Sequence, residues 1–287
     1  MGLPSGVPGV KTSGVSATSS RAHRLLLLVP AYNEEERIGP VLREFAAFFR
    51  EHYTGRFGIV VVLNGCVDNT LGVVQAVAAE YPEVSWQNFP GRIGKGGALI
   101  EGLKLAPEAD LIGYVDADGA TGPAAFLKLI ELADRADCVI GSRWLEGAVL
   151  HQSQTWVRRR FSRVFHVIVQ MLFGMGIQDT QCPAKLMRRN AVTVVHDALE
   201  IADLAFDVNL LYALKRQGFR VLEVPIEWTD KMGSSVTRSL LRSSVVMFLS
   251  VVRLRVVYSP FRSLLRLLRP FETWLYARLK APPPRSA

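Results

Sequence analysis

Residues 111–121 read Leu-Ile-Gly-Tyr-Val-Asp-Ala-Asp-Gly-Ala-Thr, a short apolar run that ends in two carboxylates and a turn. Because the apolar run is continuous rather than alternating, it indicates a strand buried on both faces of a sheet. Asp116 and Asp118 then fall at the carboxyl end of that strand. Hard divalent cations prefer such oxygen ligands, so the pair predicts a site for Mg²⁺ or Mn²⁺. Taken alone, the pair could equally cap the next helix, with Thr121 before Pro123 as its N-cap.

Further apolar runs stand on both sides of this stretch and alternate with helical patterns. Strands are predicted at Leu25–Val29, Ile59–Leu63, Val84–Gln87, Leu111–Val115, Cys138–Gly141 and Arg220–Ile226. Helices are predicted near residues 34–52, 68–80, 95–106 and 123–134, and again within residues 153–217, with breaks at Gly174, Gly176 and Pro183. Strand and helix in turn indicate βαβ units, so we expect an α/β fold with a mostly parallel sheet flanked by helices. Ligands of such sheets bind beyond the carboxyl ends of the strands.

The composition is that of a folded chain with a basic end. The 287 residues are 49% hydrophobic and 21% charged, which allows a sizeable core and excludes disorder throughout. Three cysteines without a CxxC spacing argue against a disulfide framework and a zinc site. The net charge is +8, but the segment from Arg238 onward carries ten of the 34 Lys and Arg and one of the 26 Asp and Glu. The remainder is nearly neutral, which argues against a protein that binds nucleic acid over its whole surface.

The basic end has the pattern of two helices that lie on a membrane. Ser239–Tyr258 and Phe261–Lys280 combine apolar residues with arginines and are separated by Pro260. The second helix sets arginines against an apolar face at helical spacing: Arg262, Arg266 and Arg269 against Phe261, Leu264, Leu265 and Leu268. These helices are too interrupted by charge to span a bilayer, so we expect them to lie at an anionic membrane surface. The alternative is a terminal helix packed on the body or on another subunit.

The chain is expected to have four parts. Residues 1–22, rich in Gly, Pro, Ser and Thr, are predicted to be a flexible leader. Residues 23–237 form the α/β domain, residues 238–280 the basic membrane-associating helices, and residues 281–287 a flexible tail. The apolar run that follows Arg24 has five residues, too few for the core of a signal peptide, so we expect no signal peptide.

Polar residues also follow the other predicted strands. Residues 30–35 read Pro-Ala-Tyr-Asn-Glu-Glu, and residues 63–70 read Leu-Asn-Gly-Cys-Val-Asp-Asn-Thr. Residues 91–97, Gly-Arg-Ile-Gly-Lys-Gly-Gly, place a lysine in a glycine-rich turn that suits an approach to anionic oxygens. The turn lacks the spacing of a P-loop, and no GxGxxG follows the first strand, so neither nucleotide-binding motif is favoured.

Taken in order, these motifs resemble those of family 2 glycosyltransferases of the GT-A fold. The resemblance also rests on Gly-Ser-Arg at 141–143, Asp-Thr-Gln-Cys-Pro-Ala-Lys-Leu at 179–186, Phe-Asp-Val-Asn-Leu-Leu at 206–211, Val-Pro-Ile-Glu-Trp-Thr at 224–229 and Gly-Ser-Ser at 233–235. It covers roughly residues 24–260 and is similar to the polyprenyl-phosphate branch, above all to dolichyl-phosphate β-glucosyltransferases, then to dolichol-phosphate mannose synthases. It implies a Rossmann-like GT-A domain followed by an amphipathic helical tail.

The function implied by the resemblance is an enzyme at the cytosolic face of a membrane that moves a hexose from a nucleotide sugar to a lipid phosphate with inversion. The expected donor is UDP-glucose, the acceptor a dolichyl or other polyprenyl phosphate, and the cofactor Mg²⁺ or Mn²⁺. The alternative is a related transferase with GDP-mannose or another nucleotide sugar, or with a non-phosphate lipid or glycan acceptor. A non-enzymatic module that binds membrane or nucleic acid would use only the basic tail and leave four strand-end motifs unexplained.

The resemblance also assigns roles to residues. Donor contacts are expected at Pro30, Tyr32, Glu34, Val62, Asn64, Lys95, Asp116, Ala117 and Asp118, of which Asp116 and Asp118 would hold the metal. The acceptor phosphate is expected at Arg143, Arg158 and Ser162. The expected catalytic residues are Asp118, Arg143 and Asp179, the last being either a base or a group that orients arginines. A phosphate acceptor is already anionic at pH 7, so it needs positioning and charge screening rather than a base.

Three positions depart from the family's pattern. Residues 63–64, Leu-Asn, stand where two acids are common, which bears on the choice of nucleotide. Residues 183–184 read Pro-Ala in place of Gly-Phe, on the acceptor side. Ser235 replaces a lysine near the diphosphate, for which Lys231 or Arg238 would be the substitute.

Overall fold

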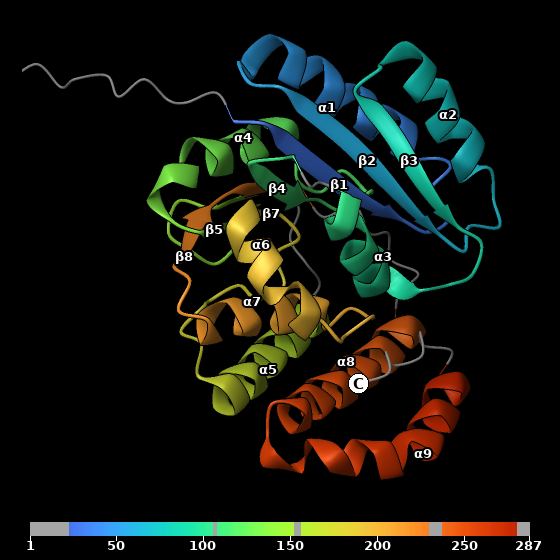
Figure 1. The fold of residues 1–287 in the computed structure, drawn as a ribbon, viewed down its shortest axis with the longest axis vertical. Helices are drawn as coiled ribbons and strands as arrows, with labels where there is room; N and C mark the ends of the chain where they lie inside the picture. The colour runs from blue at the N-terminus through green and yellow to red at the C-terminus, as the bar shows by residue number, and fades with distance from the viewer. Residues whose placement is uncertain (1–22, 106–107, 152–155, 230–236, 280–287) are drawn as a thin grey trace, which may run out of the picture.

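The structure is a computed structural model that describes residues 23–105, 108–151, 156–229 and 237–279. Its centre is a seven-stranded sheet in the order β3-β2-β1-β4-β7-β5-β8, with helices on both faces (Figure 1). The strands are β1 Leu25–Ala31, β2 Phe57–Asn64, β3 Val84–Phe89, β4 Leu111–Tyr114, β5 Cys138–Ser142, β7 Lys185–Arg188 and β8 Val221–Pro225. The predicted α/β fold is confirmed, and every predicted strand is present with small shifts at its ends.

One strand of the sheet escaped prediction. β7 lies between β4 and β5 and pairs antiparallel with both, whereas all the other pairs of neighbours in the sheet are parallel. Its four residues read Lys-Leu-Met-Arg, so charges at both ends hide the apolar run that marked the other strands. Leu186 and Met187, the two in the middle, are buried on opposite faces of the sheet.

The inner strands β1, β4 and β5 are buried on both faces, as their continuous apolar runs predicted, whereas the edge strand β3 is mostly exposed. Within β1, Leu27 and Val29 belong to one hydrophobic core, while Leu26 and Leu28 belong to the other. The first core is covered by α1 Ile38–His52, α2 Thr70–Glu80 and α4 Pro123–Glu131. The second is covered by α3 Gly94–Gly102, α6 Arg189–Val195 and α7 Phe206–Arg216 (Figure 1). Single turns of 3₁₀ helix follow several helices, at Leu103–Leu105, Ala133–Arg135 and His196–Ala198.

The first of the two C-terminal helices packs on the second core. After α5, Trp156–Phe173, and the small parallel pair β6 Val149–Leu150 and β9 Glu227–Trp228, the chain forms α8, Thr237–Val257, a 3₁₀ turn, Pro260–Ser263, and α9, Leu264–Arg278. Val251 and Leu254 of α8 are fully buried in the second core. Figure 1 shows α8 and α9 together below α7. Packing on the body, the alternative considered for the tail, is therefore what α8 does.

None of the helices in the described part of the chain combines the length and apolar character that a bilayer crossing requires. The predicted leader, residues 1–22, and the predicted flexible tail, residues 281–287, lie outside the described residues. In the described part of the chain, the carboxyl ends of β1, β2, β4 and β5 lie along one edge of the sheet. Most of the predicted site residues follow these strand ends.

Candidate active site

The loops after β1 and β2 are hydrogen-bonded to each other at this edge. The hydroxyl of Thr70 accepts a bond from the backbone N–H of Glu34 at 2.8 Å. The side-chain carbonyl of Asn33 accepts one from the backbone N–H of Val67 at 2.9 Å. Asn33 has a φ of 55°, in the left-handed region that Asn tolerates better than most residues. The two loops therefore form one wall of the site.

The predicted donor residues of β1 and β2 differ in their exposure. Pro30 and Val62 are buried in their strands. Asn64 is 3% exposed, and its amide donates to a backbone carbonyl at the end of β1 at 3.0 Å. Tyr32 is 40% exposed, with the guanidinium of Arg92 over its ring at 4.7 Å. Of these four residues, Tyr32 has the most exposed side chain. Asn64 is buried, and its hydrogen bond holds the ends of β1 and β2 together.

Three carboxylates act on one another in the site: Glu34 after β1, and Asp116 and Asp118 after β4. Burial and then the charge of Asp116 raise the pKa of Asp118. Burial raises the pKa of Glu34, to which both aspartates add, and the ion pair with Arg37 at 2.6 Å only partly offsets this rise. Lys95 supplies the opposing charge, with Nζ 2.6 Å from Asp116 Oδ1. Although burial alone would lower the pKa of Lys95, the charge of Asp116 leads a net rise, so the ammonium stays charged.

The donor atoms at this point fit a divalent cation. Asp116 and Asp118 supply carboxylate oxygens, and their mutual repulsion is relieved by a cation. Mg²⁺ commonly binds one or two protein carboxylates and completes its shell with water and substrate phosphate. Within the described ranges, no group of three or more His, Cys, Asp or Glu could hold a metal by itself. The pair therefore suits a cation that is bound jointly with a diphosphate.

Lys95 is presented by a glycine turn at the start of α3, as the sequence predicted. Gly94 has a φ of 77°, a conformation that L side chains rarely adopt. A Cβ on Gly96 would lie 2.5 Å from the carbonyl oxygen of Ile201, and the N–H of Gly97 donates to the carbonyl of Ala202 at 3.0 Å. The glycines are thus required by close packing against the segment of residues 198–206.

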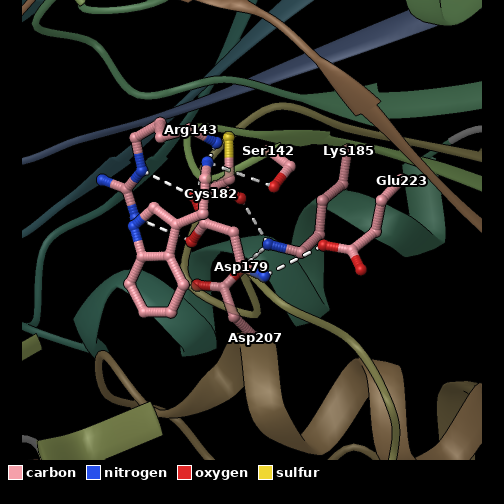
Figure 2. Close-up of polar contacts among 8 residues, drawn as sticks. Ser142, Arg143, Asp179, Cys182, Lys185, Asp207 and Glu223 are labelled. Carbon is pink, nitrogen blue, oxygen red and sulfur yellow. Dashed lines mark hydrogen bonds and ion pairs between the residues drawn. The ribbon is translucent and has the colours of Figure 1, made fainter. Parts of the chain in front are cut away.

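Arg143, directly after β5, is held by Asp179 (Figure 2). Its Nε donates to Oδ2 at 2.7 Å, its Nη2 to Oδ1 at 2.8 Å, and its backbone N–H to Oδ2 at 3.0 Å. Burial alone would raise the pKa of Asp179, but the hydrogen bonds and charge of Arg143 hold this pKa below its ordinary value. Both carboxylate oxygens are engaged and ionised, so the geometry favours an orienting role for Asp179 over that of a base.

Two further residues hold this pair through contacts that could not be predicted from the sequence. Glu223 on β8 accepts hydrogen bonds from the backbone N–H groups of Gln178, at 2.8 Å, and of Asp179, at 2.9 Å. The ring of Trp228 lies 5.2 Å from the guanidinium carbon of Arg143. Trp228 lies in the motif at residues 224–229, which belongs to the resemblance. Glu223 lies in a predicted strand in which no sequence pattern distinguishes it.

A buried ion pair joins the strands of the site to α7 (Figure 2). Lys185 Nζ donates to Asp207 Oδ1 at 2.5 Å and to the carbonyl of Cys182 at 2.5 Å. The hydroxyl of Tyr114 donates to the same Asp207 oxygen. Burial would raise the pKa of Asp207, but Lys185 and then Lys95 lower it. The network ties β4 to the loop before β7. Lys185 and Asp207 each lie in a sequence motif of the resemblance, at 179–186 and 206–211, but the sequence could not pair them.

The remaining predictions have mixed outcomes. Thr121 is not an N-cap: α4 begins after Gly122, with Pro123 at its first position, so Thr121 stands one residue too early. Among the described residues, the buried Thr121 hydroxyl has no hydrogen-bond partner. The capping alternative is therefore wrong. Ser162 is half-buried on α5, and Ala117 is buried beside the aspartates. The side chains of Arg158, Lys231 and Arg238 and residues 233–235 lie outside what the structure describes.

Comparison with protein families supports the resemblance found in the sequence. The sequence pattern of the family described as glycosyl transferase family 2 matches residues 27–195, a range that contains Asp116, Asp118, Arg143 and Asp179. A dolichyl-phosphate beta-glucosyltransferase of Trichomonas vaginalis is 35% identical over 214 residues, which cover 71% of this chain and 63% of that relative. The enzyme of the same description from Saccharomyces cerevisiae is 30% identical over 260 residues, 82% of this chain and 75% of the relative.

More distant relatives share the fold. A polyprenol monophosphomannose synthase of Mycolicibacterium smegmatis is 27% identical over 233 residues, 78% of this chain and 86% of the relative. A solved structure of glucosyl-3-phosphoglycerate synthase from Mycobacterium tuberculosis, in complex with Mn²⁺, UDP and glucosyl-3-phosphoglycerate, superposes with a TM-score of 0.62. It is 16% identical, and the match covers 83% of this chain and 82% of that one. At this identity the likeness shows a common fold.

Proposed function

This chain belongs to glycosyltransferase family 2 and is a glycosyltransferase, and we propose that it moves glucose from UDP-glucose to a dolichyl or other polyprenyl phosphate, with inversion at the anomeric carbon. The observation that carries the proposal is the Arg143–Asp179 pair, which stands within electrostatic reach of Asp116. One edge of the sheet thus carries two groups. Asp116 and Asp118 would bind the metal and the donor diphosphate, and Arg143 would bind the acceptor phosphate.

The donor half of the site is formed by β1, β2, β4 and the glycine turn. A divalent cation held by Asp116 and Asp118 would neutralise the donor diphosphate and stabilise it as it leaves. Lys95, charged and 2.6 Å from Asp116, stands ready for an anionic oxygen of the same diphosphate. The exposed ring of Tyr32, two residues before Glu34, would stack on the nucleobase.

The acceptor half is formed by Arg143 and the loop of Asp179. An oxygen of the acceptor phosphate attacks the anomeric carbon, the bond from that carbon to the donor diphosphate breaks, and the diphosphate departs with both electrons. No proton has to be removed from the attacking group, which agrees with an Asp179 carboxylate that is already occupied. Because Nε and Nη2 of Arg143 donate to Asp179, Nη1 is the nitrogen left for the phosphate.

Membrane contact at the cytosolic face is part of the proposal. Large apolar side chains are exposed on α5 and α9, among them Met171 at 75%, Leu267 at 77% and Trp274 at 54%. Arg269 is exposed on the same terminal helix. Apolar insertion together with arginine contacts to lipid phosphate is how a helix is held at an anionic interface.

The test is transfer from radiolabelled UDP- and GDP-sugars to a polyprenyl phosphate, each with Mg²⁺, Mn²⁺ or EDTA. We expect a lipid product from UDP-glucose with metal and none with EDTA. A product from GDP-mannose alone would replace the donor in the proposal. Transfer to no lipid phosphate from any donor would overturn the acceptor assignment.

A further inference from the structure

The segment of residues 198–206 lies between the glycine turn and the C-terminal helices. On one side it contacts the turn, through the bond from Gly97 N–H to the carbonyl of Ala202 at 3.0 Å. A Cβ on Gly96 would meet both Ile201 and Phe206 at less than 3 Å, so nothing separates the two pieces of backbone. Any shift of this segment therefore moves the turn that presents Lys95.

On its other side the segment is held by α8, α9 and the turn between them. Asp203 Oδ2 accepts a hydrogen bond from the hydroxyl of Ser250 on α8, and that hydroxyl lies 2.7 Å from the hydroxyl of Tyr276 on α9. Arg262, in the 3₁₀ turn, forms an ion pair with Glu200 at 2.7 Å. The segment is thus bound to both C-terminal helices through polar side chains.

The contacts among Asp203, Ser250 and Tyr276 are buried, so they favour one relative position of the three side chains. Asp203 is 6% exposed, Tyr276 is 5% exposed, and Ser250 is fully buried. A buried polar group that loses its hydrogen bond destabilises the protein, so these three groups favour one arrangement. The second oxygen of Asp203 accepts from the backbone N–H of Ala205 at 2.8 Å, just before α7 begins. One carboxylate thus joins the start of α7 to α8 and, through Ser250, to α9.

We propose that Asp203 is a positioning residue for the nucleotide-sugar site: together with Ser250 and Tyr276 it holds residues 198–206 against the glycine turn, so that the C-terminal helices set the position of Lys95. The inference rests on the proposed function, because it assigns Lys95 to the donor diphosphate. It gives the tail a second role besides attachment to a membrane. The chain of contacts runs from Tyr276 through Ser250 and Asp203 to the turn, and ends at the Lys95–Asp116 pair.

The experiment measures the full-length protein in solution without lipid, so that membrane attachment plays no part. Affinity for UDP with Mn²⁺ is measured by calorimetry, and amide hydrogen exchange of residues 94–97 is followed in the free protein. Ser250→Ala and Tyr276→Phe remove one hydroxyl each. We expect UDP affinity to fall about tenfold and the Gly97 amide to exchange faster, because its acceptor carbonyl is no longer held. Ser250→Thr keeps the hydroxyl, so its UDP affinity and its exchange rate at the Gly97 amide should equal those of the wild type.

The matched control is Tyr53→Phe. The hydroxyl of Tyr53 is also partly buried and donates to the backbone carbonyl of His23 at 2.6 Å, but it lies at the amino end of β1, away from the site. This variant should lose similar thermal stability with no change in UDP affinity or in exchange at residues 94–97. Unchanged affinity and exchange in Ser250→Ala and Tyr276→Phe, beside a wild type that binds UDP, would overturn the inference alone. A wild type that binds no UDP with Mn²⁺ would overturn the donor assignment and with it the inference.

Discussion

Asp179 uses both of its carboxylate oxygens to hold Arg143, through three hydrogen bonds of 2.7 to 3.0 Å. The guanidinium is thereby fixed in one plane, with Trp228 alongside it. An arginine fixed in this way loses little further freedom when it binds a phosphate. The sequence left two roles open for Asp179, a base or a group that orients arginine, and this geometry favours the second. Substitutions at Asp179 can test that role.

Asp179→Asn should impair use of the acceptor but not binding of the donor. The amide has one accepting oxygen, so it keeps part of the contact with Arg143 but loses the charge and one bond. We expect kcat/KM for the lipid phosphate to fall about 100-fold, with UDP affinity unchanged. Because the pKa of Asp179 is held below its ordinary value, the group stays ionised above about pH 5. The wild-type rate should show no acidic limb from Asp179, and an acidic limb that disappears in Asp179→Asn would instead identify a base.

Glu223→Ala should show a weaker form of the same defect. Glu223 accepts from two successive backbone N–H groups, at 2.8 and 2.9 Å, and so places the loop that carries Asp179. We expect KM for the lipid phosphate to rise several-fold with kcat for bound substrates less affected. Glu227→Ala is the control, since Glu227 is an exposed carboxylate nearby whose partner is His151. Equal kinetics for the two variants would remove Glu223 from the positioning of the clamp.

Asp118→Ala should abolish transfer without unfolding the protein. Burial and repulsion from Asp116 raise the pKa of Asp118, so removal of its carboxylate relieves that repulsion and offsets the loss of the hydrogen bond from the backbone N–H of Ala120 at 2.9 Å. Thermal unfolding should show a melting temperature at or slightly above that of the wild type, and binding of Mn²⁺ with UDP should be lost. Asp197→Ala, a change at a fully exposed acid in the 3₁₀ turn after α6, serves as the control for both measurements. Near-normal turnover in Asp118→Ala would remove Asp118 from the metal site.

Asp207→Asn should destabilise the fold by about 3–5 kcal/mol, because it leaves Lys185 buried without its counter-charge. The pKa of Asp207 is lowered in the folded state, so its contribution is present above the unfolded pKa, about 3.9. That contribution is lost as the pH falls through the lower, folded pKa. The difference between wild type and Asp207→Asn in urea unfolding should therefore be largest at neutral pH and shrink in acid. Replacing the pair together by Lys185→Met and Asp207→Leu should recover much of the loss.

Leu267→Asp should weaken attachment to anionic vesicles. Leu267 is 77% exposed on α9, so the change leaves the core intact and places a negative charge on the face proposed to meet lipid. Deleting all residues from 238 onward would be a poorer test, because Val251 and Leu254 are buried in the second core. Vesicle flotation should fall for Leu267→Asp, while Val67→Asp, at a loop residue exposed to a similar degree, should float like the wild type. Equal flotation of the two variants would move the membrane contact away from α9.

β1, β2 and β4 were predictable because each of them is a continuous apolar run. Leu25–Ala31 and Phe57–Asn64 pack on both faces of the sheet, so nearly every residue in these two strands is apolar. β7 was not predictable by the same criterion, because Lys185 is buried only by virtue of Asp207, 22 residues away. A charge that is neutralised by a distant partner is indistinguishable in sequence from a charge in solvent.

The candidate site also contains residues that the sequence predicts and residues that it does not. Asp116 and Asp118 were found because two acids after a buried strand form a local pattern. Glu223 and Asp203 were missed because each acts through backbone or side-chain groups far along the chain, Glu223 across 44 residues and Asp203 across 47. Local spacing shows which residues stand at a strand end, but only the packed structure shows which residues hold them there.

The position of β7 also sets the order in which the sheet can be completed. β1 to β4 pair among themselves and are synthesised in succession, so this half can form as the chain emerges. β5 has no neighbour among them: its partners are β7 and β8, both of which are made later. Until residue 185 is available, β5 remains an unpaired strand with two open edges, and pairing across such a distance in sequence is slow. The strand end that carries Asp116 can thus be in place during synthesis, whereas the glycine turn has to wait for residues 198–206 and the acceptor arginine at the end of β5 has to wait for β7.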